Sequence, residues 1–294
     1  MNLSSIVQNV LSALSDPKAV LLGVLLLVTV VFVALWTRVS WRHFGIGVLT
    51  DFLDTLGIGS FATTTSMYRL GRLVADENIP GTLNVGHALP TVVQALIYIT
   101  IVEVDIQTLI LLIFAAVGGS WIGAAIVAGL PRAAIQRGMG VALLVAAVLM
   151  VMTALDRFPG GGEALALTSG KLIAACAINF ALGALMTLGI GAYAPIMIMV
   201  SLLGMNPTAA FPIMMGSCAF LMPIAGYQFI RKGRYDMSAA VGLTIGGIPA
   251  VLAAALIVRS LPLNWVRWLV VVVVVYAAIS LLRSARHTAV GSRQ

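Results

Sequence analysis

The chain has 294 residues, of which 61% are hydrophobic and only 9% are Asp, Glu, Lys or Arg. Soluble domains average about 45–50% apolar and about 25% charged residues, so a soluble fold could not cover its surface with so few charges. This composition excludes a cytosolic enzyme, a nucleic-acid-binding module and a disordered chain. The net charge of +7 is assigned to the basic loops that membrane proteins keep on their cytoplasmic side.

The N-terminal region contains the first apolar run, at residues 19–36. A cleaved signal has a shorter apolar stretch, several basic residues before it and a small-residue cleavage site. Here only Lys18 precedes the run, and the run ends at Trp36. We therefore predict a retained transmembrane helix, preceded at residues 3–14 by an amphipathic segment on the membrane surface. Together they form an N-terminal region of residues 1–43.

Eight more apolar segments follow and leave no room for a soluble domain. About 20 helical residues, at about 1.5 Å each, cross the hydrocarbon core, so most segments fit one crossing. The polar stretches 68–85 and 156–171 are predicted to be loops. The apolar segments are 44–67, 86–102, 106–130, 138–155, 172–201, 208–228, 237–258 and 265–282.

Two of these segments are unusual, and they match each other. Segment 44–67 contains aspartates and interior glycines, and segment 172–201 is too long for one straight span. Thr55-Leu56-Gly57-Ile58-Gly59-Ser60 matches Thr187-Leu188-Gly189-Ile190-Gly191-Ala192, and Gly118-Gly119 with Leu130-Pro131 matches Gly246-Gly247 with Leu261-Pro262. The nearly constant spacing predicts a duplication, with residues 44–155 as repeat 1 and 156–294 as repeat 2 plus a cytoplasmic tail. The alternative is chance agreement between apolar runs.

The distribution of positive charge indicates how the repeats are oriented. If each glycine-rich segment enters the membrane and returns to the same side, most of the 17 lysines and arginines fall on one side. A single crossing by each segment separates them less well, so the positive-inside rule favours re-entrant hairpins and inverted repeats. The predicted fold is an all-α polytopic membrane protein with two inverted repeats. Each repeat has one glycine-broken re-entrant hairpin and three spans, and one extra transmembrane helix precedes them.

The glycine-rich breaks are the candidate substrate site. A broken helix exposes backbone N–H groups that cost several kcal/mol in hydrocarbon unless water, protein or a ligand meets them. Helices that restart after the breaks would direct N–H groups and partial positive charge at an anion. Close helix packing through glycine is the alternative reading. The candidate substrate-binding residues are Gly57, Gly59, Ser60, Thr63, Thr64, His87, Gly189, Gly191, Tyr193 and Ser217.

Three ionisable residues lie in apolar segments, where such groups are usually functional. Asp51 and Asp54 are three residues apart and therefore lie on one helix face. We expect them to have structural or proton-linked roles, because a carboxylate would repel an anion. His87 either donates to an anion when protonated or carries a coupling proton, and an interfacial histidine bound to a neighbour is the alternative. Ser217 occupies the matching position in repeat 2.

These motifs resemble those of the sulfite exporter TauE/SafE family of membrane permeases. The resemblance covers residues 44–282 and rests on Asp54–Thr65, Met186–Val200, Gly216-Ser217 and the two Gly-Gly…Leu-Pro signatures. Family members often have three glycines after the first break, where this chain has Gly59-Ser60-Phe61. The resemblance implies a multi-pass protein of the bacterial inner membrane that carries small sulfur-containing anions such as sulfite or sulfonates. Its partners are then the anion and the lipid bilayer, with no nucleic acid, and its oligomeric state stays open.

The function predicted from these features is secondary transport by alternating access around a midplane anion site, with no cofactor, metal or catalytic residue. The chain has no G-x-x-x-x-G-K-[ST] motif and is therefore not itself an ATP-driven pump. A passive anion channel would share the same site chemistry. An intramembrane enzyme using Asp51 with Asp54, or Ser217 with His87, is a further alternative, although H-E-x-x-H and G-x-S-x-G are both missing.

Overall fold

The computed structural model describes residues 40–157, 161–189, 191–257 and 263–291. It is about 80% helical, and these ranges contain no β-strand, only an isolated bridge between Ala164 and Met205. Five of the described helices are long and apolar enough to cross a membrane, and a bent helix pair makes a sixth candidate. These features confirm the predicted class, an all-α multi-pass membrane protein. The predicted segments 3–14 and 19–36 lie outside the described residues.

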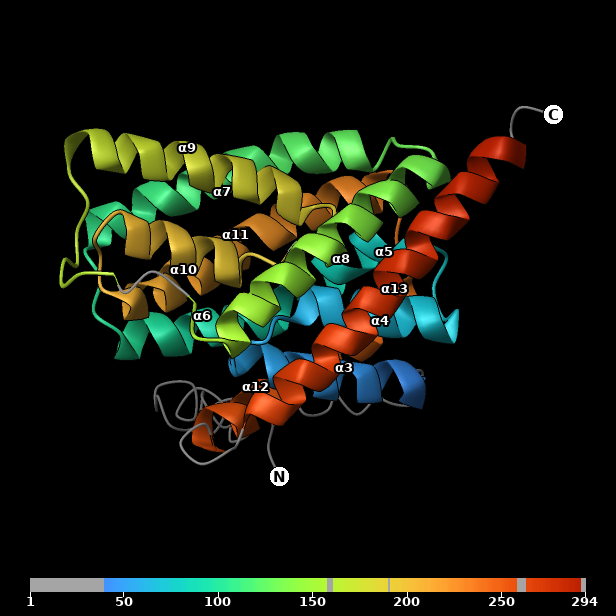
Figure 1. Cartoon of the computed structure of the whole chain (residues 1–294), viewed down its shortest axis with the longest axis horizontal. Coiled ribbons are helices and arrows are strands. Elements are labelled where there is room, and N and C mark those ends of the chain that lie inside the picture. The colour runs from blue at the N-terminus through green and yellow to red at the C-terminus, as the bar shows by residue number, and fades with distance from the viewer. Residues whose placement is uncertain (1–39, 158–160, 190, 258–262, 292–294) are drawn as a thin grey trace, which may run out of the picture. The chain divides into compact units, whose positions relative to one another are not determined.

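The helices, shown in Figure 1, follow the predicted apolar segments with three corrections. The predicted loop 68–85 contains a helix, because Ile79 and Leu83 have no exposed surface and are buried in the core. The helix over the predicted segment 138–155 begins at Arg132, six residues before that segment. The last helix runs to Gly291, nine residues beyond the predicted segment 265–282, so most of the predicted tail is helical. The helices of the first half are α3 (Trp41–Thr55), α4 (Ser60–Gly71), α5 (Ile79–Gly86), α6 (Ala88–Ile101), α7 (Ile106–Val127) and α8 (Arg132–Ala154). Those of the second half are α9 (Ser169–Met186), α10 (Tyr193–Leu202), the 3-10 turn η1 (Pro207–Ala209), α11 (Ala210–Arg231), α12 (Met237–Ile257) and α13 (Leu263–Gly291).

Each glycine-broken segment folds back on itself. The ring of His43, near the start of α3, packs edge-on against Tyr68, near the end of α4, with 5.6 Å between ring centroids. Lys171, near the start of α9, donates through Nζ to the carbonyl of Leu203, just beyond α10, at 2.9 Å. Both pairs of half-helices are therefore antiparallel hairpins whose two ends lie at the same level.

Each hairpin packs along a helix from the other half of the chain. A Cβ atom at Gly47 of α3 would lie 2.7 Å from the Leu243 carbonyl oxygen of α12, and one at Gly123 of α7 would lie 2.6 Å from the Ala184 carbonyl oxygen of α9. Glycine allows these backbones to touch, as small residues do in membrane helix pairs. Along each pair the contacting residue numbers rise together, so α3 runs parallel to α12 and α9 runs parallel to α7.

The helices between the hairpins run in opposite directions. Tyr98 of α6 stacks on Phe211 at the start of α11, while a Cβ at Gly81 of α5 would touch Phe229 near the end of α11. The bent α5–α6 pair is therefore antiparallel to α11. Helices α8 and α13 also lie side by side with opposite directions (Figure 1). Helix α11 is the most enclosed candidate span, with 78% of its apolar window buried.

The loops between the helices gather at two ends of the bundle. At one end Asp76 binds Arg69 and Arg132, and Asp236 donates its backbone N–H to Thr82. At the other end the segment 162–165 hydrogen-bonds to the loop before α7 and to the loop before η1. The first end contains basic residues from the loops 68–85, 131–137 and 229–236. The distribution of positive charge in the sequence predicts these loops on one side of the membrane.

Candidate functional site

The two hairpin tips depend on glycine backbone geometry. Gly57, Gly59 and Gly189 have φ angles of 79°, 92° and 98°, in the left-handed region that other residues rarely adopt. After α3 ends, the backbone N–H of Gly57 bonds to the Asp54 carbonyl, and Gly59 then directs the chain into α4. These glycines therefore make the chain reversals that the sequence predicted at the two breaks.

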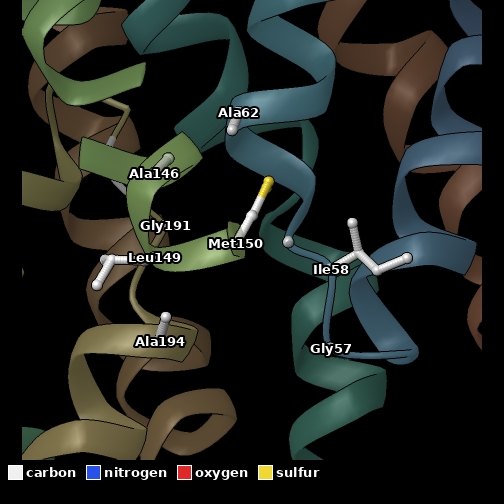
Figure 2. A pocket seen from close by; sticks show the side chains of 9 residues that line it. Gly57, Ile58, Ala62, Ala146, Leu149, Met150, Gly191 and Ala194 are labelled. Atoms are coloured by element: carbon white, nitrogen blue, oxygen red, sulfur yellow. The ribbon is translucent and has the colours of Figure 1, made fainter. Parts of the chain in front are cut away.

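The two tips border a common cavity of about 40 Å³ (Figure 2). Gly57, Ile58 and Ala62 line it from the first hairpin, and Gly191 and Ala194 line it from the second. Helix α8 closes the remaining side with Ala146, Leu149 and Met150, and the Met150 side chain extends toward the first hairpin (Figure 2). Its volume exceeds the about 10–15 Å³ that one water molecule needs, while the side chains that line it are all apolar.

A second cavity of about 20 Å³ lies between the same tips. Gly59 and Ser60 line it on one side and Gly191 on the other, and its far wall is rich in sulfur. Thioether and thiol groups are polarisable and carry no net charge here. The sulfur-bearing residues are Met186, Met214, Met215, Cys218 and Met222.

The same cavity contains one polar group without a partner and one acidic group. The hydroxyl of Thr91 on α6 is buried, lines the cavity and makes no hydrogen bond. Asp54 lines it as well and accepts the backbone N–H of Ser60 at 2.8 Å. The side chains of Ser60 and Gln94 also hydrogen-bond to Asp54. Asp54 therefore caps α4, and the Ser60 amide is not the free donor that the sequence reading expected.

Asp51, His87 and Thr64 form a chain of hydrogen bonds beneath the first tip. His87 lies at the 44° bend between α5 and α6, and its Nδ1 is 2.8 Å from Asp51 Oδ1. Its Nε2 is 3.0 Å from Thr64 Oγ1 on α4. All three residues have no exposed surface. Both ring nitrogens of His87 are therefore engaged within the protein, and neither faces the cavities as an anion donor.

Of the remaining predicted substrate-binding residues, some lie at the hairpin tips and others lie away from the cavities. Thr63 donates its hydroxyl back to Gly59 and Ser60 carbonyls, which is the usual local bond of a helical threonine. Ser217 is buried on α11 and accepts from Asn179 at 3.1 Å, so it does not reach the cavities. Tyr193 begins α10, but its side chain lies outside the described residues.

The sequence reading missed five residues that contribute to this region. Thr91 is one turn beyond His87, a spacing that places it on the same side of α6. Met214, Cys218 and Met222 recur every four residues and thus form one face of α11, a pattern visible in the sequence. Gly247 of α12 lies directly against Asp51 Oδ2, and only the folded structure brings these two together.

A basic depression of about 380 Å³ lies at the end of the bundle where the basic loops gather. Arg69, Arg72 and Arg132 line it, together with the buried Asp76. Asp76 accepts two hydrogen bonds from Arg69 and one from Gln136 at 2.7 Å. The excess of positive charge can attract anions toward this end of the protein.

The described residues contain no group of three or more His, Cys, Asp or Glu side chains placed to hold a metal ion. No family model matches the chain, and neither a curated protein nor a solved structure matches it.

Proposed function

We propose that the protein is a secondary transporter of small sulfur-containing oxyanions, such as sulfite or organic sulfonates. The two glycine-broken hairpins form its substrate site and move relative to the rest of the bundle during alternating access. The observation that carries this proposal is that both tips, from opposite halves of the sequence, border the same two cavities.

Helix directions support an inverted repeat. Helices α3 and α12 are parallel to each other and to α5–α6, while α9, α7 and α11 form a second parallel set. Because α6 and α11 are antiparallel, the two hairpins point in opposite directions and approach each other from opposite ends. Transporters built this way bind their substrate where the broken helices of the two repeats meet.

The chemistry of the tips suits an anion that must be released again. The unpartnered Thr91 hydroxyl offers a donor without net charge, and Thr65, whose hydroxyl is likewise buried and unpartnered, lies near Gly189 of the opposite tip. Uncharged donors bind an oxyanion more weakly than arginine would.

The resemblance to the TauE/SafE family supports the same cargo class and a place in the bacterial inner membrane. A monoanion that moves without a coupled proton gains about 2.3 kcal/mol per 100 mV on leaving a cell with a negative interior, so uncoupled export needs no nucleotide. A passive anion channel remains the second candidate, because the same cavities serve both mechanisms.

The proposal is tested by filling the cavity without disturbing the backbone. A Cβ atom at Gly191 meets nothing within 4 Å, because it would project into the open space between the tips. Gly191→Leu in proteoliposomes should lower sulfite and methanesulfonate counterflow at least tenfold. The matched control is Gly45→Leu, whose Cβ also meets nothing within 4 Å but which is exposed on α3.

Equal counterflow in the two variants and the wild type would show that the cavity is not the anion path. Flux that neither saturates nor exchanges one anion for another would favour the channel over the carrier.

A further inference from the structure

Beneath the first tip lies a buried carboxylate with only one of its two oxygens hydrogen-bonded. Asp51 has no exposed surface, and its Oδ1 accepts from His87, but its Oδ2 has no hydrogen-bond partner. Gly247 lets the backbone of α12 close directly over that oxygen, since any side chain there would collide with it. A buried, unpaired carboxylate oxygen is costly, and the cost is several kcal/mol when the group carries an uncompensated charge.

Charge balance fixes how many protons this pair holds when it is buried. With a neutral imidazole and an ionised Asp51 the pair carries one net negative charge in the interior. One added proton, shared between Asp51 and His87, makes the pair neutral overall, whether as an ion pair or as two uncharged groups. The packed arrangement of α3, α12 and the α5–α6 bend therefore favours the proton-loaded pair.

Among the described residues, the charges that act on Asp51 come from His87 and from Asp54, and Asp54 supplies no positive charge. On α3 the neighbouring ionisable group is Asp54, which is also acidic, whereas Arg42 and His43 lie two helical turns or more before Asp51. On α4 the neighbouring group is Tyr68, and Arg69 binds Asp76 instead. The sequence of α12 has no acidic or basic residue, and the α5–α6 pair adds only His87 and Tyr98. Cys218 of α11 faces Asp54. The pair can therefore lose its proton only when movement of the hairpin admits water.

We infer that the Asp51–His87 pair is a proton-binding site, and that the protein carries one proton together with each anion in the same direction. This inference rests on the proposed function and names its coupling ion. Loading the proton removes a negative charge next to the tip, where Ser60 and Thr64 are one helical turn apart on α4. Anion and proton therefore favour each other's binding, and by linkage each raises the affinity for the other.

Repeat 2 lacks this arrangement. With the offset of 132 between the two breaks, Asp51 matches Gly183 and Asp54 matches Met186, neither of which can ionise. Ser217, which matches His87, accepts from the neutral Asn179 at 3.1 Å. One coupling proton per cycle follows, because only the first hairpin contains the acid–imidazole pair.

The test uses methanesulfonate, a strong-acid anion that cannot itself carry a proton across the membrane. Proteoliposomes are held at zero membrane potential with potassium and valinomycin, and a pH gradient of one unit is imposed. One proton per anion predicts accumulation of methanesulfonate on the alkaline side by about tenfold. Asp51→Asn and His87→Gln should retain anion counterflow but lose this accumulation, since in each variant the altered pair can no longer bind and release the proton.

The matched control is Thr50→Val. Thr50 is the buried neighbour of Asp51 on α3, and its hydroxyl bonds only to the Ile46 carbonyl one turn before it. This variant should accumulate the anion like the wild type. Thermal unfolding of all variants shows whether each is folded before its transport is read.

The outcomes separate the two proposals. Wild-type protein that shows counterflow but does not accumulate methanesulfonate under the pH gradient would overturn proton coupling and leave anion transport standing. Continued accumulation of methanesulfonate by Asp51→Asn would show that the coupling proton binds elsewhere and would overturn the inference. Folded Asp51→Asn and His87→Gln variants that have lost counterflow would also overturn the inference. If the wild type moves neither methanesulfonate nor sulfite, the transport function fails, and the coupling fails with it.

Discussion

Two glycines on α3 allow the packing of the first hairpin to be tested quantitatively. A Cβ atom at Gly47 would lie 2.7 Å from the Leu243 carbonyl oxygen and 2.8 Å from its Cα, whereas ordinary contacts begin at 3.4 Å. The backbone of α12 would therefore have to retreat by about 0.7 Å. Overpacking of this kind costs about 1–3 kcal/mol. At Gly45, two residues away, a Cβ meets nothing within 4 Å.

Gly47→Ala and Gly45→Ala are thus expected to change the free energy of unfolding in opposite directions. Both gain the about 0.5–1 kcal/mol by which alanine exceeds glycine within a helix. Gly45→Ala keeps that gain, while Gly47→Ala loses it to the collision and becomes less stable than the wild type. The free energies of unfolding of the two variants should differ by about 1–3 kcal/mol.

The chain provides its own unfolding probe for this measurement. Cys218 is buried on α11 and Cys176 is partly exposed, so a Cys176→Ser background leaves one thiol that reacts only on unfolding. Unfolding in detergent is followed by a dye that fluoresces when it reacts with this thiol. If Gly47→Ala proves as stable as Gly45→Ala, α3 does not contact α12 as described, and the assignment of the hairpin's direction fails with it.

Three other predictions concern regions outside the tips. Asp105 accepts both the backbone N–H and the hydroxyl of Thr108 at the start of α7. Asp105→Ala should lower the free energy of unfolding by about 1 kcal/mol, whereas Asp105→Asn should lower it little, because asparagine also caps helices. Equal losses in the two variants would contradict the capping role. Those hydrogen bonds lower the pKa of Asp105 below its ordinary 3.8, so its stabilisation is full above that value and is lost as pH falls through the lower folded-state pKa. Asp76→Ala removes the acceptor of the partly buried Arg69 and of the buried Gln136, and should lower the free energy of unfolding by about 1–3 kcal/mol. Unchanged unfolding would refute the network. A membrane-permeant maleimide should modify Cys176 in the folded protein much faster than Cys218; similar rates would show that the sulfur wall is open.

Much of the architecture follows from local features of the sequence. Hydrophobicity with few charges predicts membrane helices because unpaired charges are costly in hydrocarbon. The glycine-rich breaks are predictable because only glycine tolerates the positive φ found at Gly57, Gly59 and Gly189. Short-range spacing alone also places Met214, Cys218 and Met222 on one face of α11.

Helix α5 shows where local reading fails. Its segment contains Pro80, Gly81, Asn84 and Gly86, which read as a loop. It becomes helical because Ile79 and Leu83 are buried against other elements, and tertiary burial outweighs weak intrinsic helix propensity.

The sequence by itself determined that this protein is helical and membrane-embedded and that it turns back at two matched places. Only the tertiary structure decided which polar groups meet there. Asp51 and His87 are 36 residues apart, and no periodic pattern links them, yet the bend between α5 and α6 brings the imidazole to the carboxylate. Likewise Asp54 became the cap of α4 because the turn at Gly57 and Gly59 aims the Ser60 amide back at it. Local propensity acts over a few residues, whereas the pairing of polar groups depends on long-range packing, and that packing exists only once the helices have assembled.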